Sequence, residues 1–345
     1  MLPASRMHWI LLASGATLLA TVPLFAGVYY IELASTALIA GMLALSLQLL
    51  VGCTGLVSLG HAAFYGIAAY SVYFVTPESG GLSILLTLPV AMAAAAGAAL
   101  LVGALSLRTR GFFFLMVTLA FGQMVFFLFH DTKIGGGTDG AFLARPTLSV
   151  LGWSLPLTRR QIPMAVYYVN LALLIAMYLG LAWLMRSLFG SVLTGIRVNE
   201  HRMRALGYDT TRYKLAAFVI AGALAGVAGH MWSMHRGFVN PELASWHRSA
   251  EALLMILLGG LGSLHGPILG ALAFVGLGEA AQLITERKLL VEGLVILAVV
   301  LVMPKGLAGL RLPAFMRLPE ARDGVAFEAD QYESRKNPGG PGFGD

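Results

Sequence analysis

Runs of apolar residues near the length of a bilayer crossing constrain this chain more than any other feature. Hydrophobic residues make up 58% of its 345 residues and charged residues only 12%, whereas soluble domains carry about 25% charged residues. A helix needs about 20 apolar residues to cross the hydrocarbon core. Ten candidate spans satisfy this condition or approach it, and they are residues 9–29, 33–53, 56–75, 82–106, 111–129, 164–185, 215–235, 250–262, 267–285 and 289–304. The sequence therefore predicts an all-α, polytopic integral membrane protein of about ten transmembrane or half-spanning helices.

Two of these spans are expected to depart from a regular crossing. The segment 250–262 is short enough for a half-span or a re-entrant piece, and GLVSLG at 55–60 interrupts the start of the third span. Non-helical backbone persists at membrane depth only where protein buries it or where it lines an aqueous cavity.

The distribution of Lys and Arg predicts the orientation. If the N-terminus is cytoplasmic, the inside segments hold 15 of the 23 basic residues, in keeping with the excess of positive charge on cytoplasmic loops. The densest segment is the loop at 186–214, and an even number of spans returns the C-terminus to the same side. We predict a transmembrane domain over 1–304 and a polar, disordered cytoplasmic tail over 305–345.

Motifs for catalysis, cofactors and metals are absent from the sequence. It contains no Gly-Lys pair, so it lacks the phosphate-binding GxxxxGK[ST] motif, and it has no HExxH. Cys53 is the single cysteine. Ser58 and His61 are close in sequence but have no acid partner nearby. We predict a chain that is not an enzyme, holds no cofactor or metal and, lacking a basic patch with interleaved aromatics, binds no nucleic acid.

Polar and glycine-rich positions within the spans are the candidates for a translocation pathway. The ionisable residues there are few (His61, Glu251, Glu279 and Glu292) and do not resemble the carboxylate relay of an ion-driven carrier. Five glycines fall in MILLGGLGSLHGPILGA at 255–271, which fits either broken helices around a pathway or a tight turn. The predicted pathway residues are Ser58, His61, Thr118, Gln123, Gly259, Gly260 and Gly262.

Small residues four positions apart predict close helix packing. Gly222 and Gly226 form such a pair, Gly266 and Gly270 another, and AMAAAAGAALLVGAL at 91–105 is rich in them. The GGGTDG segment, which follows the fifth span, predicts a glycine-rich turn.

The stretch GIRVNEHRMRALGYDTTRYK at 195–214 stands out because seven charges fall within twenty residues. Asn199 can cap the start of one or two helical turns, and Gly207 fits the left-handed position after their end. Anionic headgroups alone can account for the basic charge. They explain less well a short capped helix that mixes Asn, Glu and Arg, which suits a protein partner that pushes on the bundle.

Five ordered blocks resemble the permease subunits of branched-chain amino acid ABC transporters, most closely the LivM type. The blocks are GLVSLGHAAFYGIAAY (55–70), RTRGFFFLMVTLAFGQM (108–124), GGTDG (136–140), IRVNEHRMRALGYDTTRYKLAAFVIAGALAGVAG (196–229) and LLGGLGSLHGPILGAL (257–272). The resemblance covers about residues 30–310.

The resemblance implies a bacterial inner-membrane importer. In it a LivH-like permease pairs with this one, two LivG/LivF-like subunits bind ATP and Mg²⁺ and hydrolyse the ATP, and a periplasmic or tethered amino acid-binding protein delivers substrate. The cytoplasmic IRxNExxxxALG pattern of the family, together with a neighbouring arginine, gives the expected ATPase-coupling residues, Arg197, Asn199, Glu200, Arg204, Ala205, Leu206 and Gly207. Other expected contacts are with membrane lipid.

The implied mechanism is alternating access, in which ATP-driven closure of the ATPases moves the 196–207 helix and tilts the spans around the pathway. Three alternatives remain open at this point. They are a urea or short-amide importer of the same architecture, an ion-driven secondary transporter that works alone, and a membrane scaffold that transports nothing.

Overall fold

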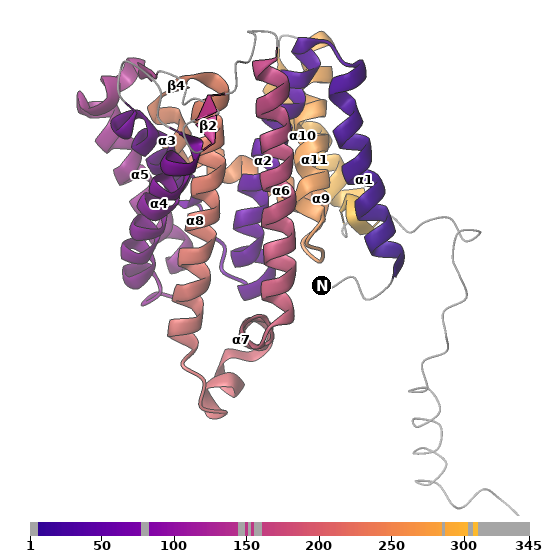
Figure 1. Cartoon of the computed structure of the whole chain (residues 1–345). Coiled ribbons are helices and arrows are strands. Elements are labelled where there is room, and N and C mark those ends of the chain that lie inside the picture. The colour runs from indigo at the N-terminus through magenta and orange to yellow at the C-terminus, as the bar shows by residue number, and fades with distance from the viewer. Residues whose placement is uncertain are drawn as a thin grey trace, which may run out of the picture. The chain divides into compact units, whose positions relative to one another are not determined.

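A computed structural model describes residues 6–76, 83–143, 149–150, 153–154, 161–284, 287–302 and 306–309, which form an upright helical bundle (Figure 1). Its longer helices are α1 (Arg6–Phe25), α2 (Val28–Gln48), α3 (His61–Val75), α4 (Ile84–Ser106), α5 (Phe112–Asp131), α6 (Ile162–Arg186), α7 (Leu188–Ala205), α8 (Thr210–Arg236), α9 (Trp246–Gly259), α10 (Gly266–Ile284) and α11 (Lys288–Val302). Its short helical turns are η1 (Leu49–Thr54), η2 (Ile134–Asp139), η3 (Pro241–Ala244) and η4 (Leu307–Gly309). The described residues belong to one compact unit that ends at Gly309, and residues 310–345 of the predicted tail lie outside the described residues.

Each of the ten predicted spans corresponds to a helix. Among the described helices, six are long and apolar enough to cross a membrane, and they are Val28–Thr54, Ile84–Ser106, Phe112–Asp131, Ile162–Arg186, Thr210–Arg236 and Gly266–Leu283. The helices α3, α9 and α11 have 15, 14 and 15 residues. At 1.5 Å per residue they are about 21–23 Å long, less than the ~30 Å hydrocarbon core. The predicted all-α, polytopic class is confirmed, with half-spanning helices among its members.

The helix α2 lies at the centre of the bundle. In its most apolar window 89% of the residues are buried, compared with 22% in α4 and in α5. It packs against α6, α8, α9 and α10 and continues into the π-helical turn η1, which Gly55 closes with a φ of +75°. Residues 55–60 are not helical and α3 begins at His61, so the predicted interruption at GLVSLG is confirmed.

Small residues join α4 to α8. Ala91, Ala95 and Ala99 recur every four residues on α4 and are fully buried. On α8, a Cβ atom added to Gly222 would lie 2.3 Å from the Cβ of Ala99, and one added to Gly226 would lie 2.9 Å from that of Ala95. The predicted close approach of helix backbones is confirmed, since any larger side chain would force the two helices apart.

Strand pairs and a glycine turn lie at the end of the bundle opposite α7 (Figure 1). The strand β1 (Ala141–Phe142) pairs antiparallel with β4 (Phe238–Val239), and β2 (Ser149–Val150) pairs antiparallel with β3 (Trp153–Ser154). The predicted turn at GGGTDG is η2, in which three successive glycines have positive φ. Through β1 and β4 this turn is tied to the end of α8.

The loop predicted at 186–214 is more helical than expected. Its first part forms the start of α7, and α8 begins at Thr210, five residues before the predicted span. Gly190 lies in the first turn of α7, where the chain turns back tightly on the end of α6. A Cβ atom there would lie 2.5 Å from the Cα of Met185.

The seam between α4 and α8 predicts a sharp difference between two glycine substitutions. Gly222→Ala inserts a methyl group against Ala99, and such overpacking is expected to lower the free energy of unfolding by about 1–3 kcal/mol. Gly97→Ala on the exposed face of α4 meets nothing within 4 Å and is expected to be neutral or to stabilise by up to about 1 kcal/mol, since Ala favours helix. Unfolding midpoints of both variants in detergent measure this difference. Equal midpoints would contradict the packing described for the seam.

Candidate functional site

A short capped helix forms the tip of the protein at the α7 end. The backbone leaves helical geometry at Asn199 (φ −158°, ψ 96°). The Oδ1 atom of Asn199 accepts a hydrogen bond from the backbone N–H of Arg202 at 3.0 Å, which is the geometry of an N-cap. Asn199 therefore divides α7 into a longer segment and a short helix that ends at Ala205, and the predicted cap is confirmed.

The short helix ends in the glycine turn expected from the sequence. Gly207 has a φ of +89°, a conformation that costs glycine little. Its N–H donates to the carbonyl of Arg204 at 2.9 Å, and the N–H of Tyr208 donates to that of Met203 at 3.2 Å. This pair of bonds is the Schellman motif, so the short helix has a defined start and a defined end.

A closed polar cluster fixes this helix to α8. The carboxylate of Glu200 accepts hydrogen bonds from Arg204 Nη2 at 2.7 Å, from Lys214 Nζ at 2.6 Å and from the Thr210 hydroxyl at 3.0 Å. Arg204 Nε also donates to the Thr210 oxygen at 2.9 Å. Thr210 is buried, and only 14% of the Lys214 side chain is exposed. Because Lys214 and Thr210 are largely shielded from water, their bonds to Glu200 hold the short helix to the start of α8 more firmly than the exposed Arg204–Glu200 pair can.

The same cluster sets the ionisation of Glu200. Partial burial by itself raises the pKa of the carboxyl group. The hydrogen bonds from Lys214 and Thr210 and the positive charges of Lys214 and Arg204 outweigh burial and bring the pKa below its ordinary value. The carboxylate is therefore charged at neutral pH, and its charge is part of the cluster.

A second bond ties the other half of α7 to the central helix. The guanidinium of Arg197 donates a hydrogen bond to the carbonyl of Gly52 in the π-helical turn η1. Arg197 also packs beside Gly55, because a Cβ atom added there would lie 3.5 Å from Arg197 Cγ. The π-helical turn has irregular hydrogen bonding, so α7 contacts the central helix where that helix is least regular.

The seven predicted coupling residues thus have different contacts in the structure. Arg197, Glu200 and Arg204 bind the body of the bundle, while Asn199 and Gly207 shape the short helix. Ala205 and Leu206 face outward. The sequence did not single out Lys214 and Thr210 as members of this site. They lie in the first turns of α8, outside the IRxNExxxxALG motif.

The outer surface of α7 combines apolar and basic side chains. Leu188, Val198 and Leu206 are 86%, 78% and 67% exposed, and the basic residues His201 and Arg202 are exposed beside them. The α7 end of the bundle therefore exposes both large apolar and basic side chains. Pocket-lining residues on the inner side of this corner include Arg108 and Arg110, which add to its positive charge.

Three of the predicted pathway residues meet inside the bundle. Ser58, His61 and Thr118 are fully buried. The Ser46 hydroxyl donates to the Leu43 carbonyl at 2.7 Å and lies 2.8 Å from His61 Nε2. A Cβ atom added to Gly60 would lie 2.0 Å from the Thr118 carbonyl oxygen. The GLVSLG segment therefore packs directly on α5, with no space between them.

The glycine turn at 259–262 is fixed to the central helix. Gln48 Nε2 donates to the carbonyls of Leu261 and Ser263, at 2.9 and 3.2 Å. Gly259 and Gly260 are buried, Gly262 is exposed, and Gln123 is half-buried on α5. None of the seven predicted pathway residues lines the pocket beside Arg108 and Arg110 or the cavity at the end of the bundle opposite α7. Their pathway role stays a prediction, and the broken α9–α10 connection that motivated it is present.

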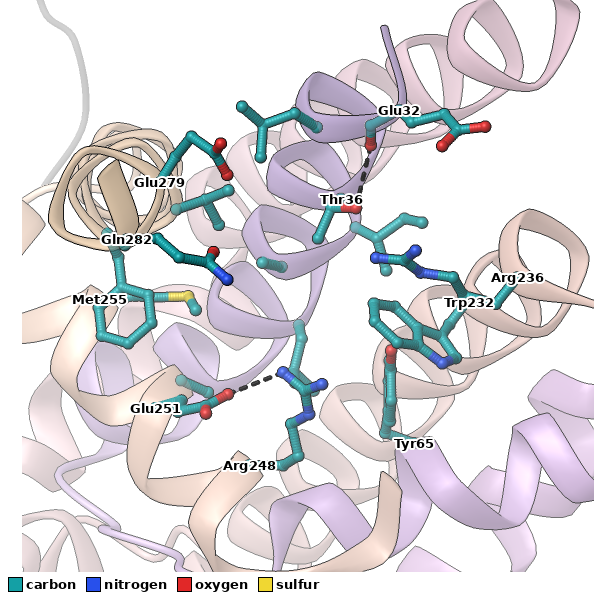
Figure 2. A pocket seen from close by; sticks show the side chains of 18 of the residues that line it. Glu32, Thr36, Tyr65, Trp232, Arg236, Arg248, Glu251, Met255, Glu279 and Gln282 are labelled. Carbon is teal, nitrogen blue, oxygen red and sulfur yellow. Dashed lines mark hydrogen bonds and ion pairs between the residues drawn. The ribbon is translucent and has the colours of Figure 1, made fainter. Parts of the chain in front are cut away.

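A cavity lies at the opposite end of the bundle from α7, since α8 starts beside α7 and the cavity includes the last turn of α8. It has a volume of about 380 Å³ and lies between the start of α2 and the neighbouring ends of α8, α9 and α10 (Figure 2). The charged side chains that line it are Glu32, Arg236, Arg248, Glu251 and Glu279. The sequence marked Glu251 and Glu279 as intramembrane carboxylates, but it gave no reason to group them with the two arginines.

No group of three His, Cys, Asp or Glu side chains in the described part of the chain is placed to hold a metal ion.

Membrane-length helices surround a buried central helix, with a polar cavity at one end of the bundle and a capped helix at the other. This architecture is that of a multi-pass membrane protein. Residues 29–303 match the family described as the permease component of the branched-chain amino acid transport system. The chain belongs to this family.

Characterised relatives agree with the family assignment. The chain is 32% identical over 301 residues to the high-affinity branched-chain amino acid transport system permease protein LivM of Escherichia coli, covering 82% of this chain and 71% of LivM. It is 37% identical over 107 residues to LivH of the same organism, which covers 30% of this chain and 34% of LivH. BraD of Pseudomonas aeruginosa is 24% identical over 302 residues, covering 78% of this chain and 91% of BraD. No solved structure gives a significant match. These similarities make the chain a branched-chain amino acid ABC permease of the LivM type.

The Glu200 cluster predicts a pH-dependent opening of the α7–α8 corner. A carboxyl group whose pKa is lowered by folding stabilises the folded corner above its unfolded pKa of about 4.3, and the stabilisation is lost as the pH falls through the folded value. We expect amide exchange over 200–208, corrected for its intrinsic pH dependence, to accelerate as the pH falls from 7 to below 4. In a Glu200→Gln variant the exchange should be fast at every pH. A corner equally protected at low pH in the wild type would contradict the role of the carboxylate.

Proposed function

We propose that this chain is the LivM-like permease subunit of an ATP-driven importer of branched-chain amino acids in the bacterial inner membrane. The similarity to LivM and LivH supports the substrate, and the α7 corner supports the energy source. One observation carries the proposal most directly. A short helix with defined ends lies outside the bundle and is joined by partly buried polar bonds to α8 and, through Arg197, to the central helix.

The proposed mechanism is alternating access. ATPase subunits bind the exposed surface of α7, and their closure on ATP displaces the short helix. The Glu200–Lys214 ion pair transmits this displacement to α8, and Arg197 transmits it to the π-helical turn of α2. Because an effector shifts a conformational equilibrium only by its differential affinity for the two states, we assign that difference to ATP binding and to the loaded binding protein.

The proposal places α7 and both termini on the cytoplasmic side. The partner chains are a second, LivH-like permease, two LivG/LivF-like ATPases that hold ATP and Mg²⁺, and a periplasmic or tethered amino acid-binding protein. The basic residues at the α7 end also suit anionic headgroups at the cytoplasmic surface. This chain supplies the transport path and the coupling surface, whereas the chemistry of hydrolysis belongs to its partners.

Purification of the tagged permease from membranes tests the class and the substrate together. The proposal expects two ATP-binding chains and a second permease to co-purify, with ATP hydrolysis stimulated by a leucine-loaded binding protein. Stimulation only by a urea-loaded binding protein would support the ATP-driven mechanism but would show that the substrate is urea and not a branched-chain amino acid. Uptake by a permease that purifies alone and follows an ion gradient would overturn the ATP-driven mechanism.

Charge reversal in the corner is predicted to uncouple transport from hydrolysis. Glu200→Lys places a cation against Lys214 and Arg204, and Arg197→Glu removes the bond to Gly52. Both variants should reach the membrane at normal levels, hydrolyse ATP in the assembled complex and lose uptake by at least about fivefold, the lower end of usual coupling free energies.

The matched control is Asp131→Lys at the far end of α5, where 64% of the side chain is exposed. It reverses one charge without touching the corner, and uptake should stay near the wild-type rate. Normal uptake by both corner variants, at normal membrane levels, would count against the coupling role of α7.

A further inference from the structure

The cavity opposite α7 carries charges of both signs on different walls. Figure 2 shows Arg236 and Trp232, from the last turns of α8, on one side, and Glu279 and Gln282, from α10, on the other. Arg248 lies between these walls, on α9. Glu32 also lines the cavity, and Glu251 forms an ion pair with Arg248, so the charges that face each other across the open space are those of Arg236 and Glu279.

The positive wall is held in place by one aromatic ring. The guanidinium carbons of Arg236 and Arg248 lie 5.2 and 5.1 Å from the ring centre of Trp232, within the range of cation–π attraction. Arg248 also pairs with Glu251 at 2.8 Å. Among the described residues, no carboxylate forms an ion pair with Arg236. Two guanidinium groups gathered on one indole ring create a local excess of positive charge that favours an anionic group.

The negative wall has a carboxylate whose partner is uncharged. Glu279 accepts a hydrogen bond from the Tyr29 hydroxyl, and no described cation lies within ion-pair distance of it. Glu279 is half-buried and Arg236 is exposed at the opposite side of the cavity. Each wall therefore offers one charge that has no ion-pair partner among the described residues and is open to a ligand group of opposite charge.

The floor of the cavity is apolar. It is formed by Ile39 and Leu43 on α2, Met255 on α9 and Phe274 on α10. Its volume of about 380 Å³ lies in the range of small-molecule pockets, roughly 300–1,000 Å³. A ligand that suits all three surfaces carries one positive group, one negative group and an aliphatic side chain.

We propose that this cavity is an acceptor site for the zwitterion of an aliphatic α-amino acid. The substrate carboxylate binds Arg236 and Arg248, its ammonium group binds Glu279, and its side chain packs on the apolar floor. This inference rests on the proposed function, to which it adds a binding site within the permease itself. A neutral amide such as urea would leave both charged walls uncompensated.

Binding of three probes to the purified complex, without its binding protein, tests the site. Saturation-transfer NMR compares leucine with leucinol, which lacks the carboxylate, and with isocaproate, which lacks the ammonium group. The wild-type complex should bind leucine more tightly than either analogue. Because each charge-assisted contact contributes about a tenfold factor, Arg236→Gln should remove most of the preference over leucinol, and Glu279→Gln most of the preference over isocaproate.

Four further variants serve as controls. Lys133→Gln and Asp131→Asn remove one exposed charge each at the same end of the bundle and should leave all three affinities unchanged. Arg236→Lys and Glu279→Asp keep the charges and should retain most of the preference, which distinguishes a lost contact from a misfolded protein.

Unchanged preferences in Arg236→Gln and Glu279→Gln, or equal binding of all probes by the wild type, would overturn the acceptor site. ATP-driven leucine uptake by the wild-type complex is measured separately, so failure of this site is distinguishable from failure of the proposed function.

Discussion

The absence of water inside a bilayer is the constraint on which the rest of this structure depends. Every backbone polar group must find a partner within the protein, so the chain forms helices and buries its irregular segments. The most irregular segment, from the π-helical turn of α2 through GLVSLG, lies against α5 and α7. Glycine and alanine let the surrounding helices approach closely enough to cover it. The centre of the bundle is therefore both its best packed and its least regular part.

Polar groups are concentrated at the two ends of this packed centre. At one end, Glu200 joins the short helix of α7 to α8 through a partly buried cluster. At the other end, Arg236 and Glu279 face the same cavity from opposite walls. The helix α2 connects the two regions, since Arg197 bonds to its last turn and the cavity includes its first residues. A displacement applied to α7 thus has a direct structural route to the cavity, through α2 and α8.

Much of this arrangement could be predicted from the sequence because short stretches of neighbouring residues determine it. Apolar run lengths give the spans, Asn199 and Gly207 give the ends of the short helix, and glycine spacing gives the seam between α4 and α8. The longer extent of α7 was missed because its first segment has too few apolar residues to resemble a span. The cavity could not be predicted at all. Arg236 and Arg248 lie near helix ends, where a basic residue ordinarily faces water, and only the fold gathers them on Trp232 and opposite Glu279.

The central claim is that α7 is the surface through which an ATP-hydrolysing partner acts on this permease. Site-specific photocrosslinking from Val198, which is 78% exposed on α7, tests it most directly in native membranes. Trp183, 76% exposed on the membrane helix α6, is the reference position. We predict that the probe at Val198 captures an ATP-binding chain and the probe at Trp183 does not. Capture of lipid alone at both positions would contradict the claim.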